Sequence, residues 1–137
     1  MKLVIDASVA IKWYVQQPLT GAARQIAASG DLFIAPDLIL AETANAFWKY
    51  VRAGQIDADK ARAALSKLPE MFETLCSLLP LTDATLEIAV TLNHPVYDCF
   101  YLALARREGS PLVTADKRLA AAAQALPDVE VRLLGCV

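Results

Sequence analysis

The stretch Lys2-Leu3-Val4-Ile5-Asp6-Ala7-Ser8 lies at the start of the chain and decides the fold class. Its apolar residues predict a short strand that ends in a carboxylate, and residues 8–15 follow with helical spacing. The same order returns near the end, where Leu112-Val113-Thr114 precedes Asp116 and a helical pattern over residues 117–125. Short strands that alternate with helices predict parallel pairing through crossover connections.

The remaining pattern continues this alternation. Helices are predicted at residues 19–29, 36–52, 57–67, 82–92 and 96–108, and strands at 32–34 and 129–134. Residues 71–79 are apolar, and their pattern leaves open whether they finish as a strand or as a helix. We expect a single domain over residues 1–137, with a three-layer α/β/α architecture, a central and mostly parallel sheet, and a helical hairpin over residues 36–67.

Composition restricts the class of protein. Hydrophobic residues make up 56 % of the chain, and the net charge is -2. That charge argues against a strongly basic nucleic-acid binder, so metal ions and local basic patches would have to attract any RNA. No apolar stretch reaches the roughly 18 to 20 uncharged residues of a membrane helix. The apolar run after Lys2 is too short for a signal sequence. We expect a cytoplasmic protein that does not contact a membrane.

The cysteines and the histidine predict no metal site of their own. Cys76, Cys99 and Cys136 are odd in number and lack C-x-x-C spacing, so neither a disulfide framework nor a zinc site is indicated. We interpret them as small buried hydrophobic residues in a reducing compartment. The single histidine, His94, belongs to no ligand pattern and is interpreted as a turn residue beside Pro95.

Two aspartates follow predicted strands. Asp6 and Asp116 each lie between a strand and a helix, at the edge where open parallel sheets bind ligands. Aspartate at such a junction is also a common helix cap, which explains either residue on its own. Ser8 could equally cap the first helix, so Asp6 is not needed for that role.

Two further carboxylates lie on predicted helices. Glu42 shares a polar stripe with Asn45, Lys49 and Arg52, for which a solvated helix face is the simpler explanation. Asp98 lies in the first turn of its helix, where a negative charge interacts favourably with the helix dipole. Taken singly, neither residue identifies a functional site.

Four motifs in order change this interpretation. They are V-I-D-A-S-V at residues 4–9, A-E-T-A-N-A at 41–46, Y-D-C-F-Y-L-A-L-A at 97–105 and L-V-T-A-D-K-R-L at 112–119. Together they closely resemble the PIN domain, and the length resembles the VapC toxins of bacterial toxin-antitoxin pairs. The resemblance implies an endoribonuclease dependent on divalent metal, with an acidic site made of Asp6, Glu42, Asp98 and Asp116 and with Ser8 and Thr114 as hydroxyls beside the metals. Residues 53–82 carry no signature.

Such a site requires cations. Four neighbouring carboxylates repel one another and raise one another's pKa values unless positive charge compensates. Ligation by oxygen alone suits Mg²⁺ or Mn²⁺. In this interpretation Asp6 is the central ligand, and Asp98 and Asp116 complete the metal shell. Glu42 ligates or orients the attacking water, and Thr114 supports a ligand. The resemblance implies RNA products with 5′-phosphate and 3′-hydroxyl ends.

Basic residues near the carboxylates are candidates for RNA binding. Lys117 and Arg118 adjoin Asp116, while Lys49 and Arg52 lie on the Glu42 side of their helix. They could guide phosphates into the acidic site, although a solvated surface explains them as well.

The resemblance also implies partners. VapC-like proteins are usually homodimers neutralised by an antitoxin, so a VapB-like antitoxin and a second copy of this chain are expected. The helical hairpin carries our candidate surface for a partner, and core packing is the alternative for the same side chains. These side chains are Phe47, Trp48, Tyr50, Val51 and Leu65.

Two other enzyme classes fit the sequence less well than a nuclease. A phosphatase of the haloacid-dehalogenase type would have a second aspartate two residues after Asp6, where Ser8 stands. A phosphoacceptor receiver domain would have an acidic pair before its strand-end aspartate. A PIN module that binds RNA or protein without cleaving, and a PIN nuclease that acts in RNA processing rather than as a toxin, both stay open. No motif indicates which RNA is cut.

Overall fold

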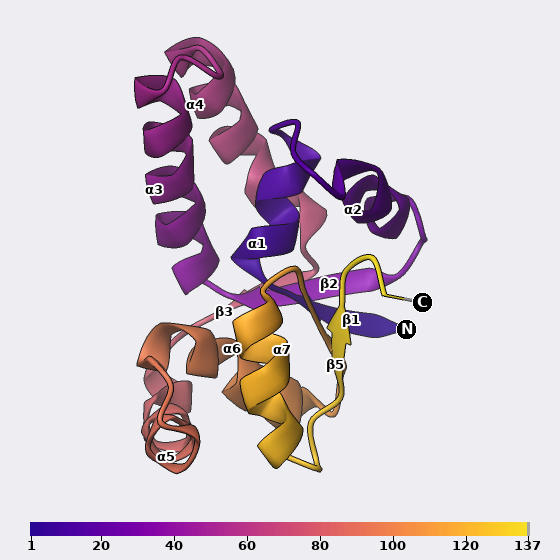
Figure 1. The fold of residues 1–137 in the computed structure, drawn as a ribbon, viewed down its shortest axis with the longest axis vertical. Helices are drawn as coiled ribbons and strands as arrows, with labels where there is room; N and C mark the ends of the chain where they lie inside the picture. Colours follow the sequence, from indigo (N-terminus) through magenta and orange to yellow (C-terminus); the bar gives the residue numbers. More distant parts are fainter. Residues whose placement is uncertain (137) are drawn as a thin grey trace.

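The computed structural model describes residues 1–136 and contains one sheet of five parallel strands between two layers of helices (Figure 1). The strands are β1 (Lys2–Ile5), β2 (Leu32–Pro36), β3 (Thr74–Cys76), β4 (Leu112–Thr114) and β5 (Val131–Leu133). The α-helices are α1 (Ala7–Ala10), α2 (Thr20–Ala27), α3 (Leu38–Arg52), α4 (Ala58–Lys67), α5 (Thr82–Leu92), α6 (Val96–Glu108) and α7 (Lys117–Ala122). Short 3-10 helices are η1 (Ile11–Trp13), η2 (Leu68–Met71), η3 (Leu79–Leu81) and η4 (Ala123–Ala125). The predicted α/β/α fold with a parallel sheet is confirmed.

Strand β1 lies at the centre of the sheet. The strand order is β3-β2-β1-β4-β5. Val4 and Ile5 are fully buried, as expected of a parallel strand covered by helices on both faces. Ile5 pairs with Val113, which brings the carboxyl ends of β1 and β4 level. Asp6 and Thr114 therefore come to the same edge of the sheet.

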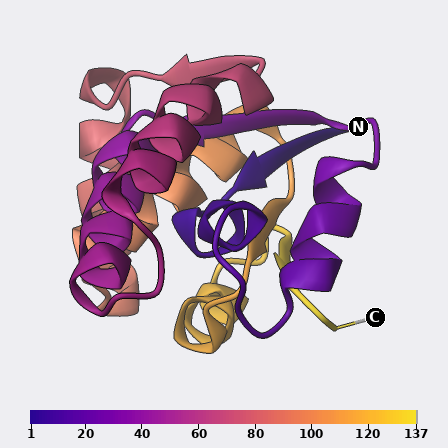
Figure 2. The same ribbon diagram turned by 90° about the horizontal axis from the view of Figure 1, so that it is seen from above.

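Crossover handedness distributes the helices between the two faces. From β1 to β3 the chain moves in one direction along the sheet, and right-handed crossovers put α1 to α4 on one face. The chain then returns through α5 and α6 to β4 and through α7 to β5, which puts these helices on the other face. Figure 1 shows α3 and α4 above the sheet and α5 to α7 below it. The predicted hairpin is present, because α3 packs against α4 (Figure 2).

Helix α6 runs through the middle of its layer and contacts β1, β2 and β4. Its residues 101–105 are all buried, so this segment is surrounded by protein on every side. Pro95 precedes the helix, and Gly109 ends it with a φ of 59°, a left-handed conformation that glycine adopts without steric cost. The predicted bounds of 96–108 are confirmed, and the first turn of α6 lies near the end of β1.

Short segments differ from the prediction. Residues 8–15 form α1 and η1 rather than one continuous helix, and the final strand spans 131–133 rather than 129–134. The apolar segment 71–79 contributes only three residues to a strand, β3. Pro69 and Pro80 lie in the 3-10 turns on either side, and proline cannot donate the hydrogen bond that a longer strand would need.

Candidate active site

Asp6 directly follows β1 and is 4 % exposed. Its Oδ2 atom accepts hydrogen bonds from the Ser8 hydroxyl at 2.5 Å and from the Thr114 hydroxyl at 2.8 Å. Its side chain makes no capping bond to helix α1, so the capping alternative for Asp6 is wrong. Two hydroxyls from separate elements thus hold one carboxylate oxygen in place.

The two hydroxyls are themselves held by backbone groups after β4. The amide of Ala115 donates to Ser8 Oγ at 2.9 Å, and the amide of Asp116 donates to Thr114 Oγ1 at 3.0 Å. Thr114 is fully buried. Because each hydroxyl accepts from the backbone, its own proton is directed to Asp6, which favours the ionised carboxylate.

Asp116 begins helix α7 and does cap it. Its Oδ1 atom accepts from the amides of Arg118 at 2.9 Å and Leu119 at 3.3 Å. The capping explanation is therefore correct for one oxygen of this residue. It does not account for the other oxygen, Oδ2, which accepts no hydrogen bond from residues 1–136 and belongs to a side chain that lines the pocket described below.

Glu42 lies on α3 and turns inward rather than into solvent. Its Oε1 atom accepts a hydrogen bond of 2.6 Å from the phenol of Tyr101 on α6. Tyr101 is fully buried, and burial raises its pKa well above the usual value, so the phenol stays protonated and donates. The sequence pattern did not reveal Tyr101, because it stands in an apolar run that indicates core packing.

Asp98 lies in the first turn of α6, as predicted. Its Oδ2 atom lies 2.7 Å from Nε2 of His94, which precedes it by four residues. His94 is thus not merely a turn residue, because its ring reaches back to a candidate ligand. The four-residue spacing was the available signal, but Pro95 between the two residues concealed it, since the pair does not lie on one helix.

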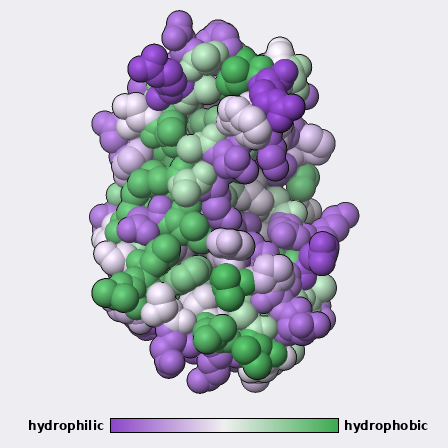
Figure 3. Space-filling model, turned by 90° about the vertical axis from the view of Figure 1, so that its left-hand side faces the viewer, coloured by the Kyte–Doolittle hydropathy of each residue, from purple (hydrophilic) through white to green (hydrophobic). Residues whose placement is uncertain are grey.

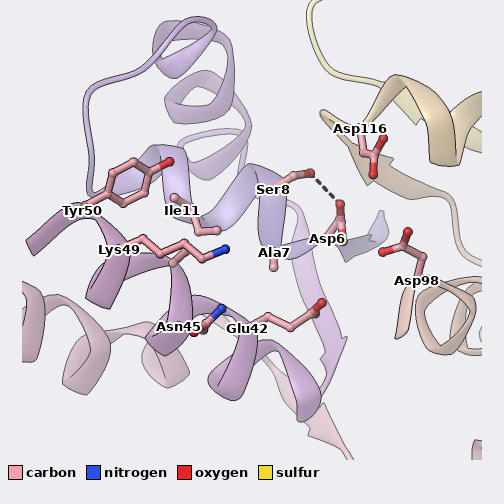
Figure 4. Close-up of a pocket in the computed structure, with 11 residues that line it drawn as sticks. Asp6, Ala7, Ser8, Ile11, Glu42, Asn45, Lys49, Tyr50, Asp98 and Asp116 are labelled. Atoms are coloured by element: carbon pink, nitrogen blue, oxygen red, sulfur yellow. Dashed lines mark hydrogen bonds between the residues drawn. The ribbon is translucent and has the colours of Figure 1, made fainter. Parts of the chain in front are cut away.

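One cavity of about 460 Å³ gathers the four carboxylates. Its other lining side chains include Ser8, Asn45, Lys49 and Tyr50. Figure 4 shows Asp6, Asp98 and Asp116 on one side with Glu42 approaching from α3, so that the carboxylates point toward a common space. The side chains come from four elements that lie far apart in the sequence. The predicted convergence of Asp6, Glu42, Asp98 and Asp116 is thus present in the structure.

The cavity disfavours negative charge. Burial raises the pKa of Asp6 from 3.8 to about 6. The hydrogen bonds from Ser8 and Thr114 limit this rise, while repulsion by Asp98 and Asp116 adds to it. Burial likewise raises the pKa of Glu42 from 4.5 to about 7, against the hydrogen bond from the Tyr101 phenol. An ion that supplies positive charge would relieve this cost.

The donor set fits a hard divalent cation. Each carboxylate has one oxygen engaged by a protein donor, and its second oxygen accepts no hydrogen bond from the described part of the chain. Oxygen ligands of this kind suit Mg²⁺ or Mn²⁺. Within residues 1–136, no three acidic, histidine or cysteine side chains already stand close enough to hold an ion together.

The predicted basic residues are dispersed. Lys49 lines the acidic cavity, and Figure 4 shows its ammonium group directed into that space. Arg52 instead lies over the Trp48 ring at 4.8 Å. Lys117 lines a different cavity, between α7 and the β5 region, and Arg118 lines neither of the two. Of these four basic side chains, only that of Lys49 lines the acidic cavity.

Apolar side chains gather on one exterior face. Figure 3 shows hydrophobic residues over the lower part of the face that carries α3 and α5. The exposed large hydrophobic side chains in η3, α5 and the start of α6 are Leu79, Leu86, Val90, Val96 and Tyr97. In the hairpin, Trp48 is 53 % exposed, but Phe47 is 2 % exposed and packs with Val15 and Ala61, so core packing is the correct explanation for Phe47.

Cys76 and Cys99 are buried as predicted, whereas Cys136 is exposed, and all three are free thiols. In the part of the chain that the structure describes, no helix combines the length and the apolar character needed to cross a membrane.

Comparison with known proteins places these features in a family. The family model described as PIN domain matches residues 3–125. Ribonuclease VapC3 of Pyrobaculum aerophilum is 36 % identical over 125 residues, which cover 88 % of this chain and 93 % of that protein. Ribonuclease VapC9 of Mycobacterium tuberculosis is 32 % identical over 123 residues, which cover 90 % and 92 % of the two chains.

Solved structures agree with this assignment. The crystal structure of PAE2754 from Pyrobaculum aerophilum superimposes with a TM-score of 0.72 at 26 % identity, covering 96 % of this chain and 83 % of that one. The structure of VapBC2 from Rickettsia felis bound to a promoter DNA fragment gives a TM-score of 0.71, with coverage of 98 % and 99 %. At 13 % identity this second likeness supports the fold alone. The family predicted from the four motifs is confirmed, and the chain belongs to the PIN domain family.

Proposed function

We propose that this protein is an endoribonuclease of the VapC type that hydrolyses RNA phosphodiester bonds at the acidic cavity. The observation that carries the proposal is the meeting of Asp6, Glu42, Asp98 and Asp116 in one cavity from four separate elements. Its relatives named as VapC ribonucleases cover nearly the whole chain, which supports the same chemistry here.

Ribonucleases of the VapC kind are metal-dependent as a class, and the donor set here favours Mg²⁺ or Mn²⁺. The open oxygens of Asp6, Asp98 and Asp116 would hold the ion, and Glu42 would hold the ion or its water. When bound, such an ion activates water and neutralises charge on the phosphodiester. Ser8 and Thr114 keep the Asp6 carboxylate oriented through their hydrogen bonds.

Substrate positioning falls first to Lys49. Its ammonium group is a cation in the lining of the acidic cavity, so it is suited to contact a phosphate beside the scissile bond. Arg52, Lys117 and Arg118 lie outside that lining and are proposed to contact RNA farther along its backbone.

Cleavage of a labelled RNA with and without Mn²⁺ tests the proposal. Activity should require the metal and should vanish in Asp6→Ala and Asp98→Ala while circular dichroism shows that the fold persists. Asp37→Ala is a matched control, since Asp37 is exposed and its side chain makes no capping bond. The products should carry 5′-phosphate and 3′-hydroxyl ends, and cyclic phosphate ends would refute metal-activated water.

The same assay separates catalysis from binding. A PIN module that only captures RNA would retain it without shortening it, whatever the metal. Mapping the 5′ ends of cellular RNA after brief induction of the wild type and of Asp6→Ala would identify the substrate. A cut within a mature RNA would indicate a toxin, whereas a cut that trims a precursor would indicate RNA processing.

We further propose a VapB-like antitoxin as protein partner and a homodimer as the assembled state. The relatives named VapC support the first, and the exposed apolar side chains of η3 and α5 suit a protein contact. Molecular mass measured by light scattering, for this chain alone and after co-expression with the product of its neighbouring gene, tests both.

A further inference from the structure

Tyr101 lies where the elements of the acidic cavity meet. It stands on α6 one turn after Asp98 and is fully buried. Its hydroxyl donates to Glu42 Oε1 on α3 at 2.6 Å. One phenol thereby joins α3 to α6. These are the helices that carry Glu42 and Asp98.

Core packing alone does not explain the hydroxyl of this residue. Its neighbours Leu102 and Leu104 are fully buried, and a phenylalanine ring would occupy almost the same space. A buried hydroxyl is costly unless it is hydrogen-bonded. Its partner here is Glu42, which lines the acidic cavity, so the hydroxyl is tied to that cavity rather than to the hydrophobic core.

The bond restricts the Glu42 carboxylate. A glutamate side chain has three rotatable bonds, and one whose carboxylate faces a cavity can occupy several rotamers. Anchoring Oε1 removes this freedom and leaves Oε2 without a donor from residues 1–136.

We infer that Tyr101 is a positioning residue whose hydroxyl fixes the Glu42 carboxylate relative to α6 and so keeps the cavity in one shape that receives a divalent cation. The inference rests on the proposed function, because that proposal supplies the cation as ligand. Tyr101 itself contacts neither the cation nor RNA.

Binding of Mn²⁺ alone, measured by calorimetry on the full chain, tests this role without relying on catalysis. Tyr101→Phe should weaken Mn²⁺ binding by about 10- to 100-fold, as loss of a partner that orients a metal ligand does. Thr85→Val is the matched control, since it also removes a buried hydroxyl, one that lies on α5 and has no partner within residues 1–136. Its Mn²⁺ affinity should stay within about twofold of the wild type.

A double-mutant cycle shows whether Tyr101 acts through Glu42. In the Glu42→Gln background, Tyr101→Phe should change Mn²⁺ affinity by less than about threefold, because the carboxylate that it orients is already gone. If Tyr101→Phe weakens Mn²⁺ binding as much in the Glu42→Gln background as it does in the wild type, the inference is wrong. Unchanged Mn²⁺ affinity of the Tyr101→Phe variant, or failure of that variant to fold, would also overturn it. If the wild type binds Mn²⁺ no better than Asp6→Ala does, the proposed function fails as well.

Discussion

Replacing Asp6 by Asn should stabilise the metal-free protein at neutral pH. Asparagine resembles the protonated aspartate in shape, and its side-chain oxygen can still accept from Ser8 and Thr114. It carries no charge into a position that is 4 % exposed. The variant thus removes the buried charge and keeps the hydrogen bonds that hold the side chain.

The magnitude follows from the pKa of Asp6. Burial raises this pKa from 3.8 to about 6, and each pH unit corresponds to about 1.4 kcal/mol. The ionised carboxylate therefore costs the folded state about 3 kcal/mol. Because the folded pKa is raised, the folded state binds the proton more tightly than the unfolded state does. Stability from this group is complete below pH 3.8 and is lost as the pH rises through about 6.

Urea denaturation of the wild type and Asp6→Asn in EDTA, between pH 4 and pH 8, measures this effect. The variant's advantage in free energy of unfolding should grow with pH to about 3 kcal/mol, with roughly half of it present by pH 5. Asp37→Asn, which changes an exposed aspartate that makes no capping bond, should show no such trend. Mn²⁺ at 100 times its dissociation constant should raise the free energy of unfolding of the wild type by about 3 kcal/mol and should leave that of Asp6→Asn unchanged.

An advantage of Asp6→Asn that does not vary with pH would refute the assignment of this cost to the buried charge. A variant less stable than the wild type at pH 8 in EDTA would do the same. Retained Mn²⁺ stabilisation in Asp6→Asn would show instead that the ion binds elsewhere.

Four further outcomes are expected. Glu42→Gln should also stabilise the metal-free protein, and its advantage should be complete above pH 7, because burial raises the pKa of Glu42 from 4.5 to about 7 and the protonated form that the folded state favours is lost as the pH rises through that value; urea denaturation in EDTA measures this effect. Thr114→Val should lower RNA cleavage by about 10- to 100-fold in a labelled-RNA assay, since the support of a candidate ligand is removed. Asp116→Asn should abolish cleavage yet keep the melting temperature, whereas Asp116→Ala should also lose about 1 kcal/mol of capping energy; equal melting of the two would argue against the cap. Lys49→Glu should weaken RNA binding and reduce its salt dependence more than Lys117→Glu does. Equal effects of the two variants in a salt titration would contradict the proposal that Lys49 contacts a phosphate beside the scissile bond.

Strands and helices with strong local signals were predictable from the sequence. Residues 96–108 form α6 as predicted, because Pro95 and Gly109 mark its ends. The stretch 112–114 likewise forms β4, since a short apolar run between two breakers is typical of a buried parallel strand. Residues 71–79 were less predictable. Their β3 pairs only with β2, so its three residues are defined by a partner distant in the sequence rather than by periodicity.

The site residues that lie in family motifs were predictable from the sequence. Those whose roles depend on tertiary contacts were not. Asp6 and Asp116 stand at strand ends, and the motifs single out Glu42 and Asp98. Tyr101 and His94 were not recognised as parts of the site, because their roles depend on hydrogen bonds to these acids. Periodicity classifies a tyrosine inside an apolar run as core, and it does not reveal where a hydroxyl or an imidazole finds its partner.

The central position of β1 has a consequence for synthesis on the ribosome. One side of β1 pairs with β2, whose residues emerge early, but its other side pairs with β4, which is translated some hundred residues after it. A nascent chain that ends before β4 exposes an unpaired strand edge and lacks the last of the four acids. An activity that needs all four carboxylates would therefore arise only after β4 and Asp116 have been synthesised, and chains that terminate before Asp116 would lack it.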